Sequence, residues 1–175
     1  MEFSVLSNEM LSLHPLRPDD YDALFQVASD QAIWAQHPDF NRYQPEGFTL
    51  YFTKLLQTDM PYLVIDEADQ SIIGATSFYQ FDKERKRVAI GFTFLATAYW
   101  GGGFNRSLKT LMIDYALQFV DTVVFHVREK NFRSQAALAK IGAKKVAEYP
   151  APADPTTLQF EYTIEKANWP HPVSS

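Results

Sequence analysis

The sequence predicts a single α/β (α+β) domain in which about four helices flank a central, mostly antiparallel mixed sheet of about seven strands. Its 175 residues suit one hydrophobic core, and 46% apolar with 15% aromatic residues can fill that core. Apolar spacing alternates between the strand period and the helix period in the order β-α-α-β-β-β-α-β-α-β-β. Because no linker interrupts this series, residues 11–167 should form one domain, with 1–10 and 168–175 as terminal extensions.

The charged and reactive residues exclude several classes of function. Sixteen Lys and Arg against 21 Asp and Glu give a net charge of −5, so we do not expect nucleic acid to bind through a general basic surface. The lack of Cys excludes disulfides, thiolate metal sites and cysteine nucleophiles, and we expect no bound metal. The sequence shows no export signal and no apolar run of membrane-spanning length, which predicts a cytoplasmic protein without membrane contact.

The first elements are a strand and two helices. Leucines alternate with polar neighbours from Leu11, which predicts a short strand, and Pro18 then opens a helix with an apolar face of helical spacing. A polar loop with scattered aromatic residues covers 31–44. Pro45 begins a second helix whose apolar stripe again recurs every three or four residues.

An antiparallel meander of three strands should follow, over Tyr62–Ile65, Ser71–Phe81 and Arg87–Leu95. Polar turns separate these strands, which favours hairpin connections. The third strand should present one alternating set of side chains on a single face: Val88, Ile90, Phe92 and Phe94.

The second half of the chain begins with a glycine turn, Gly101–Gly103, between the third strand of the meander and a strong helix. Four further elements are expected to follow that helix, which should run from Phe104 to about Val120. They are a strand over Thr122–Val127, a helix over Asn131–Ile141, and strands over Lys144–Tyr149 and Thr157–Ile164.

The glycine turn has the composition of a phosphate-binding loop. Gly101, Gly102 and Gly103 let backbone N–H groups converge at a helix N-terminus, and Asn105 and Arg106 add donors, which suits a pyrophosphate. The alternative is that the glycines only permit a tight connection. The spacing fits neither a mononucleotide loop, which needs Gly-Lys-Ser/Thr, nor a dinucleotide loop, which needs glycine at position 106.

Two motifs about 30 residues apart carry a family resemblance. Trp100, Gly101, Gly103 and Phe104 are similar to a Trp-Gly-x-Gly-Phe/Tyr loop. The stretch 131–134 is similar to Asn-x-x-Ser, and Lys140-Ile141-Gly142-Ala143 to a following Lys-x-Gly. With these motifs, the chain from about residue 11 to 166 resembles the GNAT superfamily of acyl-coenzyme A-dependent N-acyltransferases, particularly its Rim-type branch, which includes ribosomal-protein N-acetyltransferases.

The resemblance implies a GNAT-like fold and transfer of an acetyl group from acetyl-CoA to a primary amine. The acceptor would be a small molecule or a protein N-terminal amine, attacking directly in a ternary complex. A splay between the strands ending at Leu95 and starting at Thr122 would admit the pantetheine arm. The residues implied to bind the cofactor are Phe94, Leu95, Ala96, Trp100, Gly101, Gly102, Gly103, Phe104, Asn105, Arg106, Asn131, Arg133 and Ser134.

Within this set, the resemblance implies particular roles for two residues. Asn131 would hydrogen-bond the pantetheine amide, although Asn is also a frequent helix N-cap and both roles can coexist. Ser134 would lie near the thioester sulfur and act as a catalytic proton donor. The sequence departs from the family at Ala89, where the branch often carries Glu, and at Leu138, where many relatives carry Tyr. These departures leave open an alternative function, a non-catalytic acyl-CoA-binding or sensing module.

The acceptor side should lie in the loop between the first two helices. His37 is the leading base because an imidazole can titrate near neutral pH, and His126 is its rival; the more common alternative for His37 is an exposed loop histidine or one bonded to the backbone. Arg42 and Tyr43 would contact the acceptor, although surface packing accounts equally well for them. Trp34 would line the acceptor pocket, although aromatic residues at helical spacing more often belong to the core. The oligomeric state stays open, with a homodimer among the alternatives.

Overall fold

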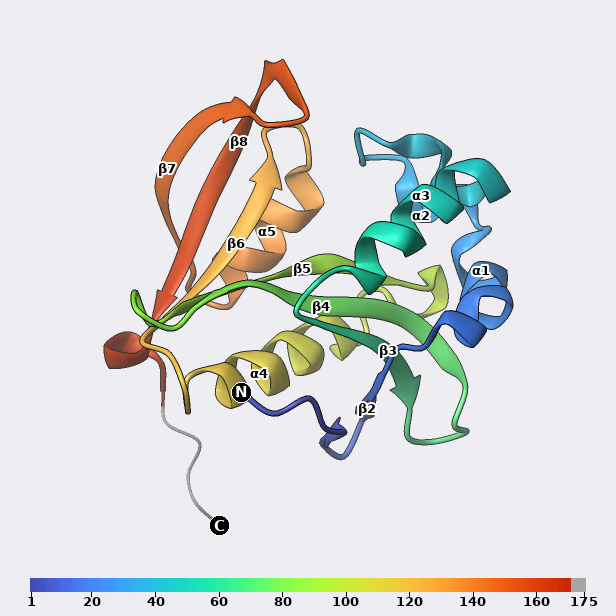
Figure 1. Cartoon of the computed structure of the whole chain (residues 1–175), viewed down its shortest axis with the longest axis horizontal. Coiled ribbons are helices and arrows are strands. Elements are labelled where there is room, and N and C mark those ends of the chain that lie inside the picture. The colour runs from blue at the N-terminus through green and yellow to red at the C-terminus, as the bar shows by residue number, and fades with distance from the viewer. Residues whose placement is uncertain (171–175) are drawn as a thin grey trace.

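The computed structural model describes residues 1–170, so the end of the expected C-terminal extension, 171–175, lies outside the described residues. One mixed sheet forms the centre of the molecule (Figure 1), with strand order β1-β2-β3-β4-β5-β6-β8-β7. Neighbouring strands are antiparallel except for the parallel pair β5 and β6. The strands are β1 (Leu6–Ser7), β2 (Leu11–Pro15), β3 (Met60–Asp66), β4 (Ile72–Asp82), β5 (Arg87–Leu95), β6 (Thr122–Arg128), β7 (Lys144–Ala151) and β8 (Asp154–Glu165).

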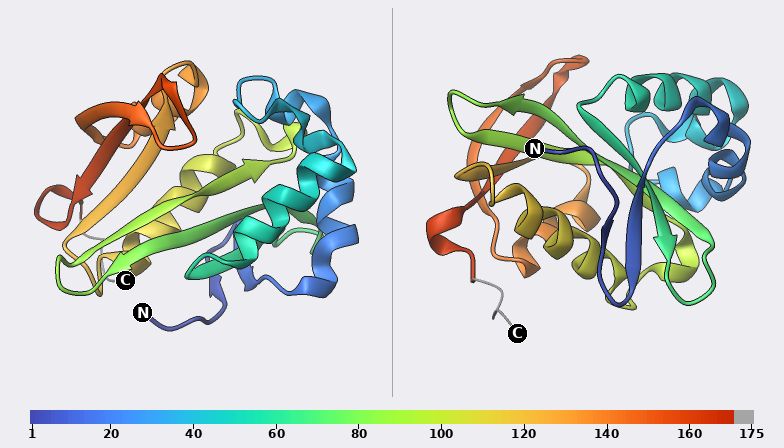
Figure 2. Two further views of the ribbon diagram at one scale, coloured as in Figure 1. Left: turned by 45° about the horizontal axis from the view of Figure 1, so that its top comes forward. Right: turned by 60° about the horizontal axis from the view of Figure 1, so that its bottom comes forward.

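Helices cover both faces of the sheet. They are α1 (Tyr21–Ala28), α2 (Gln31–Trp34), α3 (Pro45–Leu56), α4 (Phe104–Ala116) and α5 (Phe132–Lys140). The first three share an aromatic core with one face, whereas α4 and α5 pack on the other face, as the two views of Figure 2 show. No helix within residues 1–170 combines the length and the hydropathy needed to cross a bilayer.

The predicted fold class is confirmed, and residues 1–170 form eight strands and five helices in place of about seven and about four. The additional elements are short. Strand β1 has two residues, and α2 has four residues within the expected loop, where the Asp30 carboxylate accepts the Ala32 N–H. Such elements are too short to show a period, and α2 is held by the burial of Ile33 and Trp34.

Both flanks of the predicted domain pack against it. Phe3 lies edge-on to Tyr62 with ring centroids 5.2 Å apart, and the Trp169 indole N–H donates to Asp114 Oδ1 at 2.6 Å. Helix α4 ends at Ala116 rather than near Val120.

A β-bulge divides β5 into two segments. Ala75 pairs with Phe94 and Ser77 with Gly91, so Thr76 opposes two residues, and Phe92 has a left-handed φ of 55°. An inserted residue moves later side chains to the opposite face of the sheet. The expectation that Val88, Ile90, Phe92 and Phe94 share one face is therefore wrong: the first pair packs in the core under α4, and the second pair packs with α1–α3.

Strands β5 and β6 separate after a short contact. Within the described chain, their parallel pairing covers only Arg87–Ala89 opposite Thr122–Val124. Beyond it β5 stays on β4 while β6 continues against β8, and Figure 1 shows the two strands diverging. The expected splay is thus present, and it opens toward the glycine turn at the end of β5.

Candidate active site

The glycine turn presents an open helix N-terminus. Gly101 and Gly103 have left-handed φ values of 77° and 88°, which explains glycine at both positions. Gly103 is the N-cap of α4, and no side chain among the described residues caps it. The first N–H groups of an α-helix have no intrahelical partner, so those from Phe104 to Arg106 remain available to an anion.

The free edge of β5 offers fewer backbone groups than the sequence suggested. The Ala96 N–H donates to Ile73 O at 2.8 Å, and the Ala96 carbonyl accepts from the Tyr99 N–H at 2.9 Å. Because ladder bonds alternate along a strand, Phe94 also turns its backbone groups to β4, while Leu95 turns them into the splay. Of the three residues expected to pair with pantetheine, Leu95 alone is oriented to do so.

Trp100 and Arg133 join the two sides of the splay. The Trp100 indole N–H donates to Leu95 O at 3.0 Å, which leaves the Leu95 N–H as the outward-facing donor. The Arg133 guanidinium carbon lies 4.1 Å from the centre of the Trp100 ring, and Arg133 Nη2 donates to Ile33 O at 3.0 Å. Arg133 therefore connects α5 to the glycine turn and to α2, around the mouth of the splay.

The second motif begins α5. Asn131 Oδ1 accepts the Ser134 N–H at 3.1 Å, so Asn131 is the N-cap, and its NH₂ group is not needed for that bond. The Ser134 hydroxyl makes no hydrogen bond within residues 1–170. One helical turn later Leu138 is 2% exposed and belongs to the core. The structure therefore leaves the Ser134 hydroxyl, in the first turn of α5, free of partners among residues 1–170 and supplies no phenol at position 138.

His37 lies in the expected loop but not in the expected ionisation state. Its Nδ1 accepts the Asp39 N–H at 3.0 Å, which fixes the neutral ring with its proton on Nε2. Burial, followed by the positive charge of Arg42, lowers the pKa of His37 to about 3. The prediction that His37 titrates near neutral pH is therefore wrong, and at pH 7 its imidazole is a weak base.

Three other proposed acceptor residues are already engaged in local structure. Arg42 pairs with Asp39 at 2.6 Å and lies over the Tyr51 ring at 4.8 Å, which leaves its side chain only 12% exposed. Trp34 is 3% exposed, and its indole N–H donates to Ala28 O at 2.8 Å. The half-buried Tyr43 accepts a hydrogen bond from the neighbouring side chain of Gln44 at 3.2 Å. Arg42 and Trp34 thus support the loop from within rather than line an open pocket.

A polar cluster at the narrow end of the splay includes residues that the sequence did not single out. Tyr79 on β4 hydrogen-bonds His126 Nδ1 on β6 at 2.6 Å, and His126 Nε2 lies 3.5 Å from Glu161 on β8. Along β6, His126 alternates with residues that lie in the core, which indicates that its side chain points to the other face of the sheet. Its partners depend on strand register, which no local pattern reveals.

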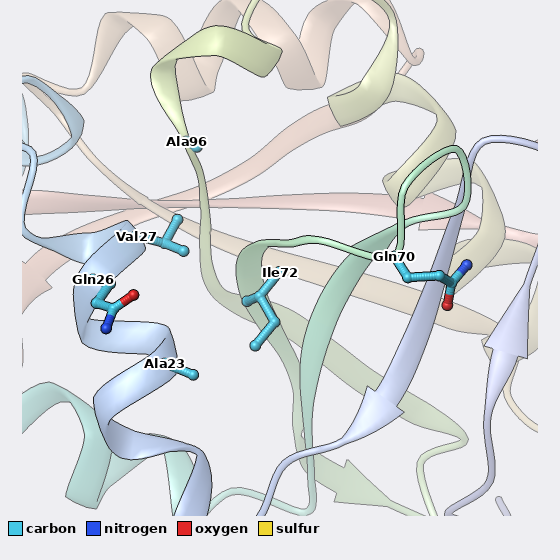
Figure 3. Close-up of a pocket in the computed structure, with 6 residues that line it drawn as sticks. All are labelled: Ala23, Gln26, Val27, Gln70, Ile72 and Ala96. Atoms are coloured by element: carbon cyan, nitrogen blue, oxygen red, sulfur yellow. The ribbon is translucent and has the colours of Figure 1, made fainter.

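An open groove of about 610 Å³ lies beside the splay rather than within it (Figure 3). Its walls come from α1, from the turn before β4 with the first residue of β4, and from the residue that follows β5. Ala96 is the only residue that it shares with the predicted cofactor site. No lining residue comes from β6 or α5, so the groove is not the cleft between the separated strands. The lining residues are Ala23, Gln26, Val27, Gln70, Ile72 and Ala96.

Solved structures of acetyltransferases share this fold. A GCN5-related N-acetyltransferase from Brucella melitensis superposes with a TM-score of 0.80 at 15% identity, covering 97% of this chain and 82% of its own. A GNAT-family acetyltransferase from Bacillus anthracis gives 0.75 at 15% identity, covering 93% and 99%. The ribosomal-protein-S5-alanine acetyltransferase from Vibrio fischeri gives 0.69 at 17% identity, covering 95% and 98%. The fold is therefore that of the GNAT acetyltransferases.

The sequence identifies the family directly. The profile of the acetyltransferase (GNAT) domain matches residues 10–144. No curated protein sequence matches the chain significantly. The protein belongs to the GNAT acetyltransferase family.

Proposed function

We propose that the protein is an acyl-CoA-dependent N-acetyltransferase that transfers acetyl from acetyl-CoA to a primary amine by direct attack in a ternary complex. One observation carries this proposal: the splay between β5 and β6 leads along β5 to an uncapped helix N-terminus. An acetyl-CoA molecule whose pantetheine arm lies beside β5 would therefore have its pyrophosphate near this helix N-terminus.

The residues of the splay fit complementary roles in acetyl transfer. The Leu95 N–H would donate to the thioester carbonyl oxygen and stabilise the negative charge that develops there. The amides from Gly101 to Arg106 would hold the pyrophosphate, and the Asn131 NH₂ group would donate to the pantetheine. As the amine nitrogen bonds to the carbonyl carbon and the carbon–sulfur bond breaks, the Ser134 hydroxyl would protonate the leaving thiolate.

The Ser134 role has a direct test. Ser134→Ala should lower kcat by roughly 10-fold without changing acetyl-CoA affinity, because the hydroxyl acts on the leaving group. An unchanged kcat would remove this role while leaving the transferase proposal intact.

The acceptor class is proposed from the Rim-type motifs and from the Vibrio fischeri neighbour, whose name states that it acetylates an alanine of ribosomal protein S5. The proposal covers protein α-amino groups and small-molecule amines. Release of free thiol from acetyl-CoA, measured over a panel of peptides and small amines, tests it. Release with N-terminal peptides alone would favour the Rim-type assignment, and release with small amines alone would contradict it.

A sensing module is the second candidate, because buried aliphatic residues stand at both positions where the sequence departs from the family motif. Ala89 and Leu138 are each 2% exposed, so neither position supplies a carboxylate or phenol to the site. Saturating acetyl-CoA should raise the Tm of either kind of protein by about 5–10 °C at 100 times Kd, with no effect of ATP or NAD. Stabilisation without thiol release from any acceptor would support the sensor and refute the transferase.

A further inference from the structure

The base that takes the proton of the acceptor amine is the missing part of the proposed function. His37 is unsuited to it because its pKa is lowered to about 3, and Ala89 carries no titratable group. The cluster of Tyr79, His126 and Glu161 combines an acceptor for a proton with a counter-charge. It lies where β5 and β6 separate.

The backbone places this cluster at the narrow end of the splay. Val124 is the last residue of β6 paired with β5, and His126 follows two residues later, so both side chains are on the same face. That face is the side of the sheet opposite α4, because Val123, Phe125 and Val127 pack on the α4 side.

Tyr79 reaches this place across β5. It starts on β4, and its ring passes over Gly91, where an added Cβ would come within 2.8 Å of Tyr79 Cε1. Phe92 holds the ring edge-on at a centroid distance of 5.5 Å. The glycine thus makes room for a hydrogen bond that links β4 to β6.

The charged neighbours of His126 define its proton positions. When the Tyr79 hydroxyl donates to Nδ1, the proton of neutral His126 lies on Nε2, directed at Glu161 Oε2 3.5 Å away. Arg87 Nη2 holds Glu161 Oε1 at 3.0 Å, and the Tyr149 hydroxyl donates to Oε2 at 3.4 Å. The carboxylate is thereby fixed beside the ring.

The ionisation of the cluster leaves His126 neutral at pH 7, with a nitrogen that can accept a proton. Burial lowers the pKa of His126, the Glu161 carboxylate opposes that shift, and Arg87 adds to it. Burial raises the pKa of Tyr79, so its hydroxyl keeps a proton to pass on. The side chains of His126 and Glu161 are 12% and 17% exposed, so the cluster is close to the surface of the splay.

We propose that Tyr79, His126 and Glu161 form the proton relay of the acetyl transfer. Tyr79 O accepts a proton from the attacking amine while the Tyr79 O–H proton passes to His126 Nδ1, and the resulting imidazolium is stabilised by Glu161. One proton leaves the amine and one is gained by His126, which later releases it to water. Tyr79 is the residue that meets the acceptor, and the other two are positioning residues that act through it. The inference rests on the proposed function.

The test combines kinetics with a titration of His126, using acetyl-CoA and an amine that the wild type acetylates. Tyr79→Phe keeps the ring and should lower kcat by about 100-fold, and His126→Gln by at least about 10-fold, with the KM for acetyl-CoA unchanged. The acid limb of the kcat–pH profile should coincide with the pKa of His126 measured by NMR. In Glu161→Gln both should move to lower pH together, because the carboxylate that favours the imidazolium is lost.

Glu165→Gln is the matched control, since Glu165 also lies on β8 but bonds Thr122 instead of His126. This control should leave kcat and the acid limb of the kcat–pH profile unchanged. A Tyr79→Phe kcat within about twofold of wild type, at an unchanged Tm, would overturn the relay. So would an acid limb that stays in place in Glu161→Gln while the His126 titration moves. A wild type that binds acetyl-CoA but acetylates no amine would instead overturn the proposed function, and the relay with it.

Discussion

Replacing His37 by Asn should make the free energy of unfolding less dependent on pH in the acid range. Burial and Arg42 lower the pKa of His37 from 6.5 to about 3. Between these pH values the unfolded chain binds a proton that the folded protein does not. The free energy of unfolding therefore falls as the pH falls through this window, and the contribution is fully present only above about pH 6.5.

The magnitude follows from the pKa difference. One pKa unit corresponds to about 1.4 kcal/mol, so the lowering from 6.5 to about 3 gives about 5 kcal/mol as an upper limit. The imidazole is only partly buried, and solvent screening reduces this to about 2 kcal/mol. Asn suits the comparison because its side-chain oxygen can still accept the Asp39 N–H that Nδ1 accepts in the wild type.

Denaturant unfolding at pH 7, 6, 5 and 4 measures the effect. Between pH 7 and pH 4 the wild type should lose about 2 kcal/mol more unfolding free energy than His37→Asn. Groups common to both proteins, such as the Asp39 carboxyl whose pKa is also lowered, largely cancel in the difference. Parallel pH dependences would refute the assignment of a buried, neutral imidazole. The same variant should keep the wild-type pH–rate profile, because His37 does not titrate in the working range.

Three further predictions concern the helix N-terminus and its surroundings. Gly102→Val should weaken acetyl-CoA binding, measured by calorimetry, at nearly unchanged Tm, because the φ of Gly102 is not left-handed. Gly103→Ala should instead lower the free energy of unfolding by about 1 kcal/mol, because the φ of Gly103 is left-handed. Arg133→Ala should lower stability by about 1 kcal/mol and change Trp100 fluorescence, because a cation–π contact and a hydrogen bond are lost; an unchanged emission spectrum would contradict that contact. Lys109→Met should raise the unfolding free energy at pH 7 by about 1–2 kcal/mol, because burial lowers the lysine pKa to about 8, and a lower Tm would contradict it.

Local patterns located the elements that carry the proposed cofactor site. The strand over Arg87–Leu95, the glycine turn and the start of the next helix at Phe104 were all predicted at their observed positions. These features depend on apolar period, on turn residues and on glycine conformation, which are properties of neighbouring residues. The same patterns missed α2, since four residues are too few to show a helical period.

The acceptor side was less predictable. Sequence pointed to His37 as a titrating base, but its pKa depends on burial and on Arg42, which only the folded loop brings together. Arg42 itself looked available for an acceptor, although the fold uses it to pair with Asp39 over the Tyr51 ring. In both cases the sequence identified the residue, but the role of its side chain depends on contacts that only the folded loop creates.

The sequence by itself determined the order of the longer strands and helices, the glycine turn and the family motifs, because each is set by residues a few positions apart. Tertiary structure decided which groups meet. The bulge at Phe92 reversed the faces of β5, and the register of β4, β6 and β8 brought Tyr79, His126 and Glu161 into contact from segments far apart in the chain. Strand register depends on packing across the whole sheet, so no local pattern contains it.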